Sequence, residues 1–397
     1  MNAAAIKKVL GNIKTLMLGS DVCYGFSDIK QNMKPFATIA IELNKRDEKF
    51  QLEKYDCCLI YIKAIEEYKK ENKEITSLST LTISQKDEIA NYILKCYLET
   101  PFTYDVVVPL EWMKPLGAHE IGGPVAITEG KRLVFSLMPD NYDYFPEVTV
   151  ETQGFLSHSA EKLFLKKVMQ SLSVLIFMLK QNGVVYSSRS HDAFPSSSNI
   201  FSDKHKRFLS INAKAQCQKF NFFDNHLSFP IAASRYLNEL SLTKNFSLLK
   251  NEMATEMVHV AVNVASELLN NRSDEAARVK SAIDWFIQAE INEDDTMSFI
   301  QVCMGLESIF GDNESEGGLT KTLADRCAYL IGRNIAERNE IKDEFKKMYK
   351  VRSKIVHGSK SYLTQSEEHL KDRAFIYLRT SISREMRNLR EIPVRNP

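Results

Sequence analysis

Two patterns of apolar spacing divide the chain at about residue 240. Before that point, short β-branched runs bounded by Gly, Pro and Asn alternate with segments in which apolar residues recur every three or four positions. After it, only the second, helical pattern remains. The sequence therefore predicts an α+β domain over residues 1–240 and an all-α helical bundle over residues 241–397.

In the first half we expect helices and short strands in alternation. Helices are predicted over residues 1–18, 57–70, 85–98 and 157–182, the third capped by Ser84 and the last ended by Gly183. Strands are predicted over residues 36–42, 104–110, 123–128, 131–136 and 148–151. A Ser-rich segment over residues 187–199 is predicted to be a mobile loop.

The second half is predicted to be a compact bundle of five or six helices. Helical periodicity covers residues 248–270, 274–290, 294–310, 320–331, 337–356 and 365–391. The breaks between these segments contain Gly, Asn and Asp, which are typical of helix caps and turns.

The composition excludes several classes of protein. Across 397 residues, 52 Lys and Arg are balanced by 51 Asp and Glu, so the net charge of +1 argues against a uniformly basic nucleic-acid coat. No run approaches the roughly 20 apolar residues that a membrane span needs. The seven cysteines are scattered and include no CxxC pair, which favours a reduced, cytoplasmic protein without a zinc site.

The common cofactor motifs are absent from the sequence. It contains no GxxxxGK[ST] or GxGxxG phosphate loop, no HExxH and no GxSxG. The histidines have no metal-ligand spacing to a second His or Cys. We therefore expect neither a metal nor an organic cofactor.

One basic segment, residues 346–358, combines groups that suit phosphate chemistry. Arg352 carries a permanent cation with a planar donor fork suited to phosphate. His357 is predicted in the last helical turn before Gly358, where free carbonyls favour a protonated imidazole. Together they suggest acid–base chemistry on a phosphodiester. The alternative is a histidine that satisfies the last carbonyls of a helix whose other basic residues are solvated.

The spacing of Arg352 and His357 creates a geometric difficulty. Five residues at about 100° each place the two side chains roughly 140° apart on a straight helix. They can converge only if the helix end distorts, or if the site is composite across a two-fold dimer.

The segment Tyr349-Lys-Val-Arg-Ser-Lys-Ile-Val-His-Gly358 closely resembles the C-terminal signature of HEPN domains, particularly of the Apea-like branch. That family is an all-α bundle with an Arg-x4–6-His motif on its last core helix. Residues 283–286, 299–310 and 323–331 are similar to the helices that precede this motif in the family. Order and spacing agree over about residues 270–390.

The resemblance implies a metal-independent endoribonuclease acting on RNA. His357 would exchange protons with the attacking 2′-hydroxyl or the leaving 5′-oxygen, and Arg352 would stabilise the phosphorane charge. RNA supplies its own nucleophile, so no metal is required. The resemblance also implies a homodimer through the bundle, in which two motifs face one cleft.

The biological role is expected from family association alone. It would be that of an abortive-infection effector against phage, responding to a phage trigger. Two alternatives remain open. One is a catalytically inactive HEPN scaffold that binds RNA, a nucleotide or a protein partner, and the other is a toxin silenced by a cognate antitoxin.

Several neighbours of the motif are candidates for supporting roles. Ser353 stands where the family often has a polar Asn, Asp or His, and it can hydrogen-bond. Tyr349 either stacks on a base or packs in the core. Glu307 and Arg326 form either a buried ion pair that holds the site or a part of the active site.

Two lysines of the same helix are candidate RNA-binding residues. Lys350 and Lys354 flank Arg352, and between residues 346 and 360 there is no carboxylate. A run of charge on one helix is commonly just a solvated face.

Overall fold

The computed structural model describes most of the chain. The described residues are 1–18, 33–46, 51–73, 81–110, 125–126, 133–139, 144–157, 161–187, 210–243, 245, 249, 251–311 and 319–391. The chain forms two compact units that interleave along the sequence. Unit 1 contains Met1–Val106, Glu151–Lys167 and Lys214–Leu227, and unit 2 contains Val107–Val150, Val168–Ala213 and Ser228–Pro397.

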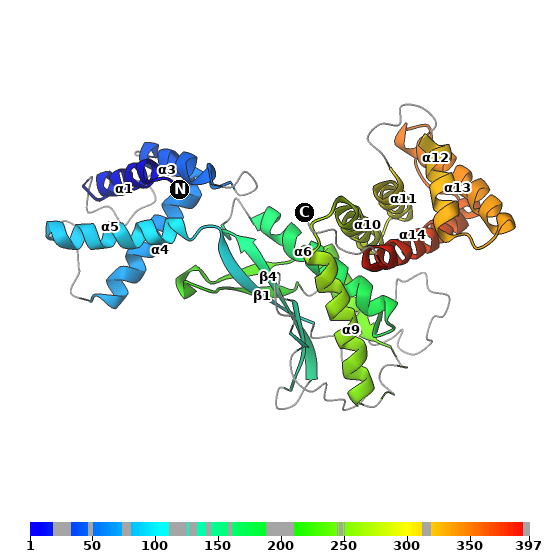
Figure 1. The fold of residues 1–397 in the computed structure, drawn as a ribbon, viewed down its shortest axis with the longest axis horizontal. Coiled ribbons are helices and arrows are strands. Elements are labelled where there is room, and N and C mark those ends of the chain that lie inside the picture. Colours follow the sequence, from blue (N-terminus) through cyan, green and yellow to red (C-terminus); the bar gives the residue numbers. More distant parts are fainter. Residues whose placement is uncertain are drawn as a thin grey trace. The chain divides into compact units, whose positions relative to one another are not determined.

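Unit 1 begins with helices, drawn in blue to cyan in Figure 1. They are α1 (Ala3–Leu18), α3 (Lys34–Asn44), α4 (Lys54–Glu71) and α5 (Ile83–Leu98). Each of these helices buries one apolar stripe. Val9 and Ile13 of α1 are fully buried, and Ile89 and Ile93 of α5 are at most 1% exposed. The cap of α5 is Thr82 rather than the predicted Ser84: its Oγ1 accepts from the Gln85 N–H and the Gln85 side chain accepts from the Thr82 N–H.

The strand predicted over residues 36–42 is wrong, because this segment is the body of α3. Pro35 lies in the first turn of the helix, where proline is tolerated. Phe36, Ile39 and Leu43 are buried at helical spacing, whereas Ile41 is 58% exposed. The β-branched composition suggested a strand, but burial of one helical face against α1 and α4 decided the conformation.

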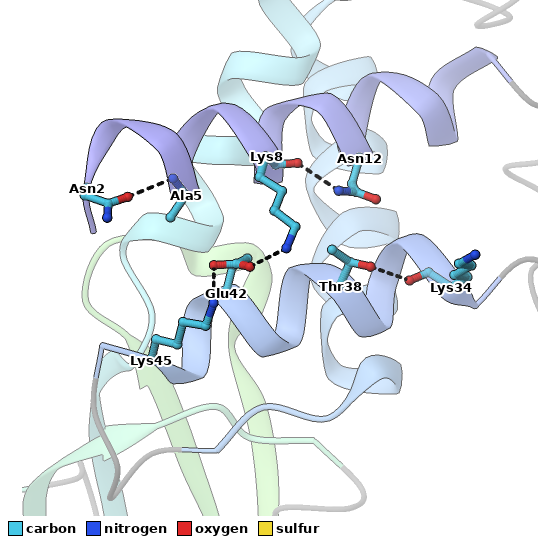
Figure 2. Close-up of polar contacts among 8 residues, drawn as sticks. All are labelled: Asn2, Ala5, Lys8, Asn12, Lys34, Thr38, Glu42 and Lys45. Atoms are coloured by element: carbon cyan, nitrogen blue, oxygen red, sulfur yellow. Dashed lines mark hydrogen bonds and ion pairs between the residues drawn. The ribbon is translucent and has the colours of Figure 1, made fainter.

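A buried carboxylate ties α3 to α1 (Figure 2). Glu42 is 4% exposed and accepts from Lys8 Nζ at 2.6 Å and from Lys45 Nζ at 2.9 Å. These two ammonium groups, Lys8 first, lower the pKa of Glu42. A hollow of about 430 Å³ lies beside them and is also lined by Arg46. The single carboxylate of Glu42 offsets one of these three positive charges, so the hollow keeps a net positive charge.

A six-stranded sheet follows in the order β2-β3-β4-β1-β6-β7. Its strands are β1 (Phe102–Pro109), β2 (Val125–Ala126), β3 (Leu133–Pro139), β4 (Tyr144–Gly154), β6 (Asn212–Cys217) and β7 (Asn225–Ser228). The pairs β2–β3 and β3–β4 are antiparallel, with Phe135 opposite both Val125 and Val148. In β1 every second side chain from Phe102 to Val108 is buried, as the two-residue period of a strand requires.

The remaining elements of the first half are short, apart from one long helix. They are α6 (Glu161–Gln181), β5 (Val185–Ser187), η3 (Asn221–Phe223), α7 (Ile231–Glu239) and β8 (Leu240–Leu242). Strands β5 and β8 pair antiparallel in a second, two-stranded sheet. The predicted loop over residues 187–199 lies outside the described residues beyond Ser187, as does Cys23.

After β8 the described residues form only helices, shown in yellow-green to red in Figure 1. They are α9 (Asn251–Asn270), α10 (Asp274–Ile291), α11 (Asp295–Phe310), α12 (Leu319–Ile331), α13 (Ile335–Val356) and α14 (Gln365–Glu391). Ser273, Asp294 and Asn334 cap three of them with a side-chain oxygen. The prediction of a mixed α/β region followed by an all-helical region is confirmed, while the domain boundary at 240 stays a prediction.

Two further findings concern the kind of protein. No helix within the described ranges is long and apolar enough to cross a bilayer. The six cysteines that the structure describes are all free and buried, and burial raises the pKa of Cys57, Cys303 and Cys327.

One buried charge network connects α6, α7 and α10 inside unit 2. The Glu290 side chain is 3% exposed and accepts from Lys180 Nζ at 2.5 Å, and the Lys180 side chain is 8% exposed. The other oxygen of Glu290 accepts from the Tyr236 hydroxyl at 2.5 Å. Because a buried charge is costly without its partner, these helices depend on one another for their positions.

We expect Lys180→Met to lower the free energy of unfolding by about 3–5 kcal/mol, because it leaves the Glu290 carboxylate buried without a countercharge. Urea unfolding followed by far-UV circular dichroism measures the loss. Arg390→Met is the matched control, since the Arg390–Glu267 pair is 51% and 62% exposed and should contribute less than about 1 kcal/mol. Adding Glu290→Gln to Lys180→Met removes both charges and should recover most of the loss. A double variant as unstable as the single one would contradict this explanation.

Candidate functional site at the end of helix α13

The last turns of α13 present one face to the core and another to solvent. Phe345 and Met348 are fully buried, and Val351 is 8% exposed. The buried face does not extend to the end of the helix, since Val356 is 50% exposed and Ile355 is half-buried. Helix α13 is continuous from Ile335 to Val356.

His357 is the C-cap residue of α13, and Gly358 follows it with φ +73°. That left-handed conformation favours glycine and ends the helix as the sequence predicts. The His357 backbone N–H donates to Ser353 O at 3.0 Å, and the Gly358 N–H donates to Ile355 O at 3.0 Å. Within the part of the chain that the structure describes, the exposed imidazole of His357 makes no hydrogen bond. Its ring therefore does not satisfy the last carbonyls, and it is free to meet a ligand.

Arg352 is held by a carboxylate from another helix. Its Nη2 lies 3.1 Å from Oε1 and 3.3 Å from Oε2 of Glu307 on α11, and both side chains are about one-quarter exposed. Its Nε is buried and has no hydrogen-bond partner among the described residues. A buried N–H without an acceptor costs about 1–3 kcal/mol, and this nitrogen has almost no exposed surface in the described structure.

Tyr349 packs in the core and is not available to stack on a base. Its side chain is 5% exposed, and its ring is stacked on Phe345 with a centroid distance of 4.7 Å. Its hydroxyl donates to Cys303 O at 3.3 Å. Burial raises the pKa of Tyr349 well above its usual value, so the hydroxyl stays protonated. Its supporting role is to hold α13 against α11.

Glu307 and Arg326 have different partners in the described structure. The ion pair of Glu307 is with Arg352. Nη1 of Arg326, on α12, donates at 2.6 Å to the carbonyl of Phe310, the last residue of α11. This carbonyl is one that the helix itself cannot satisfy. Arg326 therefore supports the end of the helix that carries Glu307.

The remaining predicted residues face solvent. Ser353, Lys350 and Lys354 are exposed. The Lys354 carbonyl accepts from Ser359 Oγ at 3.0 Å, which folds the chain back after His357.

Arg352 and His357 are not brought together within one chain. Among the described residues, no hydrogen bond or ion pair joins them, and one side chain is turned to Glu307 while the other is in solvent. Because α13 is continuous, the roughly 140° between the two positions persists. Of the two ways in which the side chains could converge, a composite site across a dimer agrees with this geometry.

The segment after His357 is anchored by contacts that sequence reasoning missed. Lys360 pairs with Glu367 at 2.8 Å, and Glu367 also accepts from the N–H and hydroxyl of Thr364 at 2.9 and 2.8 Å. The Leu363 N–H donates to Thr296 Oγ1 at 3.1 Å, which ties the segment to α11. The signal for the Thr364 contact was present as a Thr-x-x-Glu capping box before α14. Among the described residues, no group of three or more His, Cys, Asp or Glu could hold a metal ion.

The Glu367 anchor should be lost in acid. Lys360 first, and then Thr364, lower the pKa of Glu367 to about 2. A carboxyl with a depressed folded pKa contributes stability above its unfolded pKa of about 4.3, and that contribution disappears as the pH falls to about 2. We therefore expect the stability difference between the wild type and Glu367→Gln to be full at pH 5.5 and to shrink toward pH 2. Urea midpoints at stepped pH measure it, with exposed Glu368→Gln as the control. A difference that stays constant with pH would contradict the assignment.

Comparison with known proteins identified no relative: no protein-family model, no curated protein and no solved structure matches the chain.

Proposed function

We propose that the chain is a metal-independent endoribonuclease with His357 as the acid/base and Arg352 as the phosphate-stabilising cation. The observation that carries the proposal is the end of α13. Among the described residues, the exposed imidazole there has no hydrogen-bond partner, and the buried Nε of the preceding guanidinium has no acceptor. The site thus provides a proton carrier and a partly exposed guanidinium for a phosphate oxygen.

The reaction needs no group from outside the chain and its substrate. The 2′-oxygen of the RNA attacks the adjacent phosphorus, the bond from phosphorus to the 5′-oxygen breaks, and the products are a 2′,3′-cyclic phosphate and a 5′-hydroxyl. The neutral imidazole of His357 accepts the proton of the 2′-hydroxyl, or its imidazolium donates a proton to the leaving oxygen. Arg352 donates to the non-bridging oxygens as charge accumulates on them.

Glu307 would set the state of Arg352 before RNA binds. Its carboxylate occupies the outer nitrogen Nη2 and leaves the inner Nε without an acceptor. A phosphate would have to share the guanidinium with Glu307. This competition would keep the free arginine oriented and would disfavour weakly bound anions.

The proposal includes a homodimer through the helical bundle, since Arg352 and His357 diverge within one chain. Two-fold symmetry would allow Arg352 of one protomer to serve His357 of the other. Three parts of the proposal rest on the resemblance to HEPN proteins alone. They are a cytoplasmic location, an abortive-infection role against phage, and regulation by a phage trigger or an antitoxin.

A second candidate is a catalytically inactive HEPN module that binds RNA, a nucleotide or a protein partner. One observation favours it: Arg352 is already neutralised by Glu307 and shares no contact with His357. A module of this kind would bind RNA without cleaving it.

We expect His357→Ala to reduce cleavage of total RNA in EDTA by about 10²–10⁴-fold, because removal of a general acid/base has an effect of this size. Denaturing gels measure the rate, and chemical mapping of the ends identifies the cyclic phosphate. His369→Ala is the matched control, since His369 is an exposed histidine on α14 of the same unit. Equal cleavage by both variants, or cleavage that requires Mg²⁺, would contradict the catalytic assignment.

Mixing two inactive variants tests the composite site. If Arg352 and His357 act across a dimer, an equimolar mixture of Arg352→Ala and His357→Ala should regain activity that neither variant has alone, because mixed dimers contain one intact pair. Light scattering measures the dimer in parallel. A mixture that exchanges subunits but stays inactive would show that the two residues act within one chain.

A further inference from the structure

Helix α13 carries a ridge of cations at a strict spacing of four residues. We define the cationic ridge as Arg338, Lys342, Lys346, Lys350 and Lys354. Each step advances about 6 Å along the helix and turns about 40° around it. The side chains therefore form one continuous row, half-buried at Arg338 and Lys342 and exposed from Lys346 onward. The rise per step is comparable with the spacing of successive phosphates in an extended nucleic-acid strand.

An exposed aromatic ring lies at the start of the cationic ridge. Tyr329 on α12 is 64% exposed, and among the described residues its hydroxyl makes no hydrogen bond. Arg338 Cζ lies 5.0 Å and Lys342 Nζ 5.1 Å from the centre of its ring. These cation–π contacts orient the ring while leaving most of the side chain in solvent. Lys342 is fixed by Asp325 at 2.7 Å.

The positive charge of the ridge becomes less compensated toward His357. Lys342 pairs with Asp325, and Lys346 lies 3.3 Å from Asp343. Beyond Phe345 no carboxylate occurs up to residue 360, so Lys350 and Lys354 have no acidic neighbour in sequence. An anion on the ridge would therefore be attracted toward the end of α13.

The ridge leads to His357 and away from Arg352. On a straight helix, His357 lies about 20° from the direction of Lys350, whereas Arg352 lies about 160° from it. The exposed imidazole is thus at the end of the row of lysines, and Arg352 faces Glu307 on the other side of α13.

We propose that Tyr329 and the cationic ridge form the track that binds a single-stranded segment of the RNA substrate. One base stacks on Tyr329, and the following phosphates contact Lys346, Lys350 and Lys354 on the way to His357. Base–aromatic stacking requires an unpaired base, which is why a single strand fits and a duplex does not. An acidic peptide would use the lysines but has no base for Tyr329. This inference rests on the proposed function, because it names the substrate path to the same site.

Binding measured without cleavage tests the aromatic end of the track. In a His357→Ala background, we expect Tyr329→Ala to weaken the binding of a fluorescein-labelled single-stranded RNA by about fivefold or more, the effect of losing one base stack. Tyr329→Phe keeps the ring and should bind as the parent does. Tyr55→Ala is the control, since Tyr55 on α4 is 48% exposed and has Lys54 Nζ 5.2 Å from its ring centre. Circular dichroism checks the fold of each variant.

The salt dependence of the same binding tests the lysines. Each lost phosphate contact lowers the slope of log affinity against log salt by about 0.7 for a single strand, so Lys346→Gln/Lys350→Gln/Lys354→Gln should lower it by about 2. The charge-matched control is Lys7→Gln/Lys34→Gln/Lys54→Gln, which removes three exposed lysines from α1, α3 and α4.

The outcomes separate this inference from the proposed function. Binding that depends on Tyr329 and the ridge, in a protein that cleaves no RNA, would support the track and overturn the ribonuclease. Cleavage that depends on His357, with both sets of variants binding like their controls, would overturn the track alone. Equal affinity for duplex RNA, or for polyglutamate in place of RNA, would also overturn it.

Discussion

The carboxylate of Glu290 joins three segments of the chain that are far apart in sequence. It accepts from Lys180 of α6 and from Tyr236 of α7, and it lies on α10, so residues on both sides of position 240 share one buried charge. A buried carboxylate cannot lose a partner without a large cost, and the helices are therefore held in one arrangement. The edge-to-face contacts of Phe286 with Phe177 and Phe375 extend the same packing from α6 through α10 to α14.

The same requirement for pairing shapes the candidate site. Arg352 lies on the core side of α13, and Glu307 of α11 provides its countercharge. His357 lies beyond the last helical residue, where Gly358 turns the chain away and leaves the imidazole in solvent. The two groups of the motif therefore have opposite environments in one chain. An endoribonuclease built on them would need a second copy of the chain, whereas a binding module would need only the exposed face of α13.

Helix bounds were predicted most accurately where a long helical periodicity of apolar residues begins after a polar capping residue. The bounds of α10, α11 and α14 agree with the predicted segments to within one residue, because polar caps mark their ends and apolar stripes run through them. It failed at residues 36–42, where β-branched residues are typical of a strand but the neighbouring helices bury one helical face. At the site, the sequence identified Arg352, His357 and Gly358. It left open the roles of Tyr349 and Glu307. The sequence near a side chain does not indicate which residue of another helix it will contact.

The sequence by itself determined the mixed first half, the helical second half, the glycine that ends α13 and the concentration of positive charge along that helix. These features depend on local backbone preference and on the order of residues within one element. Only the tertiary structure decided that Tyr349 packs in the core and that Glu307 forms an ion pair with Arg352. It also decided that the ring of Tyr329 on α12 contacts the first cation of the ridge on α13. Each of these facts depends on which helix faces which, and that is set by the burial of side chains from segments remote in sequence.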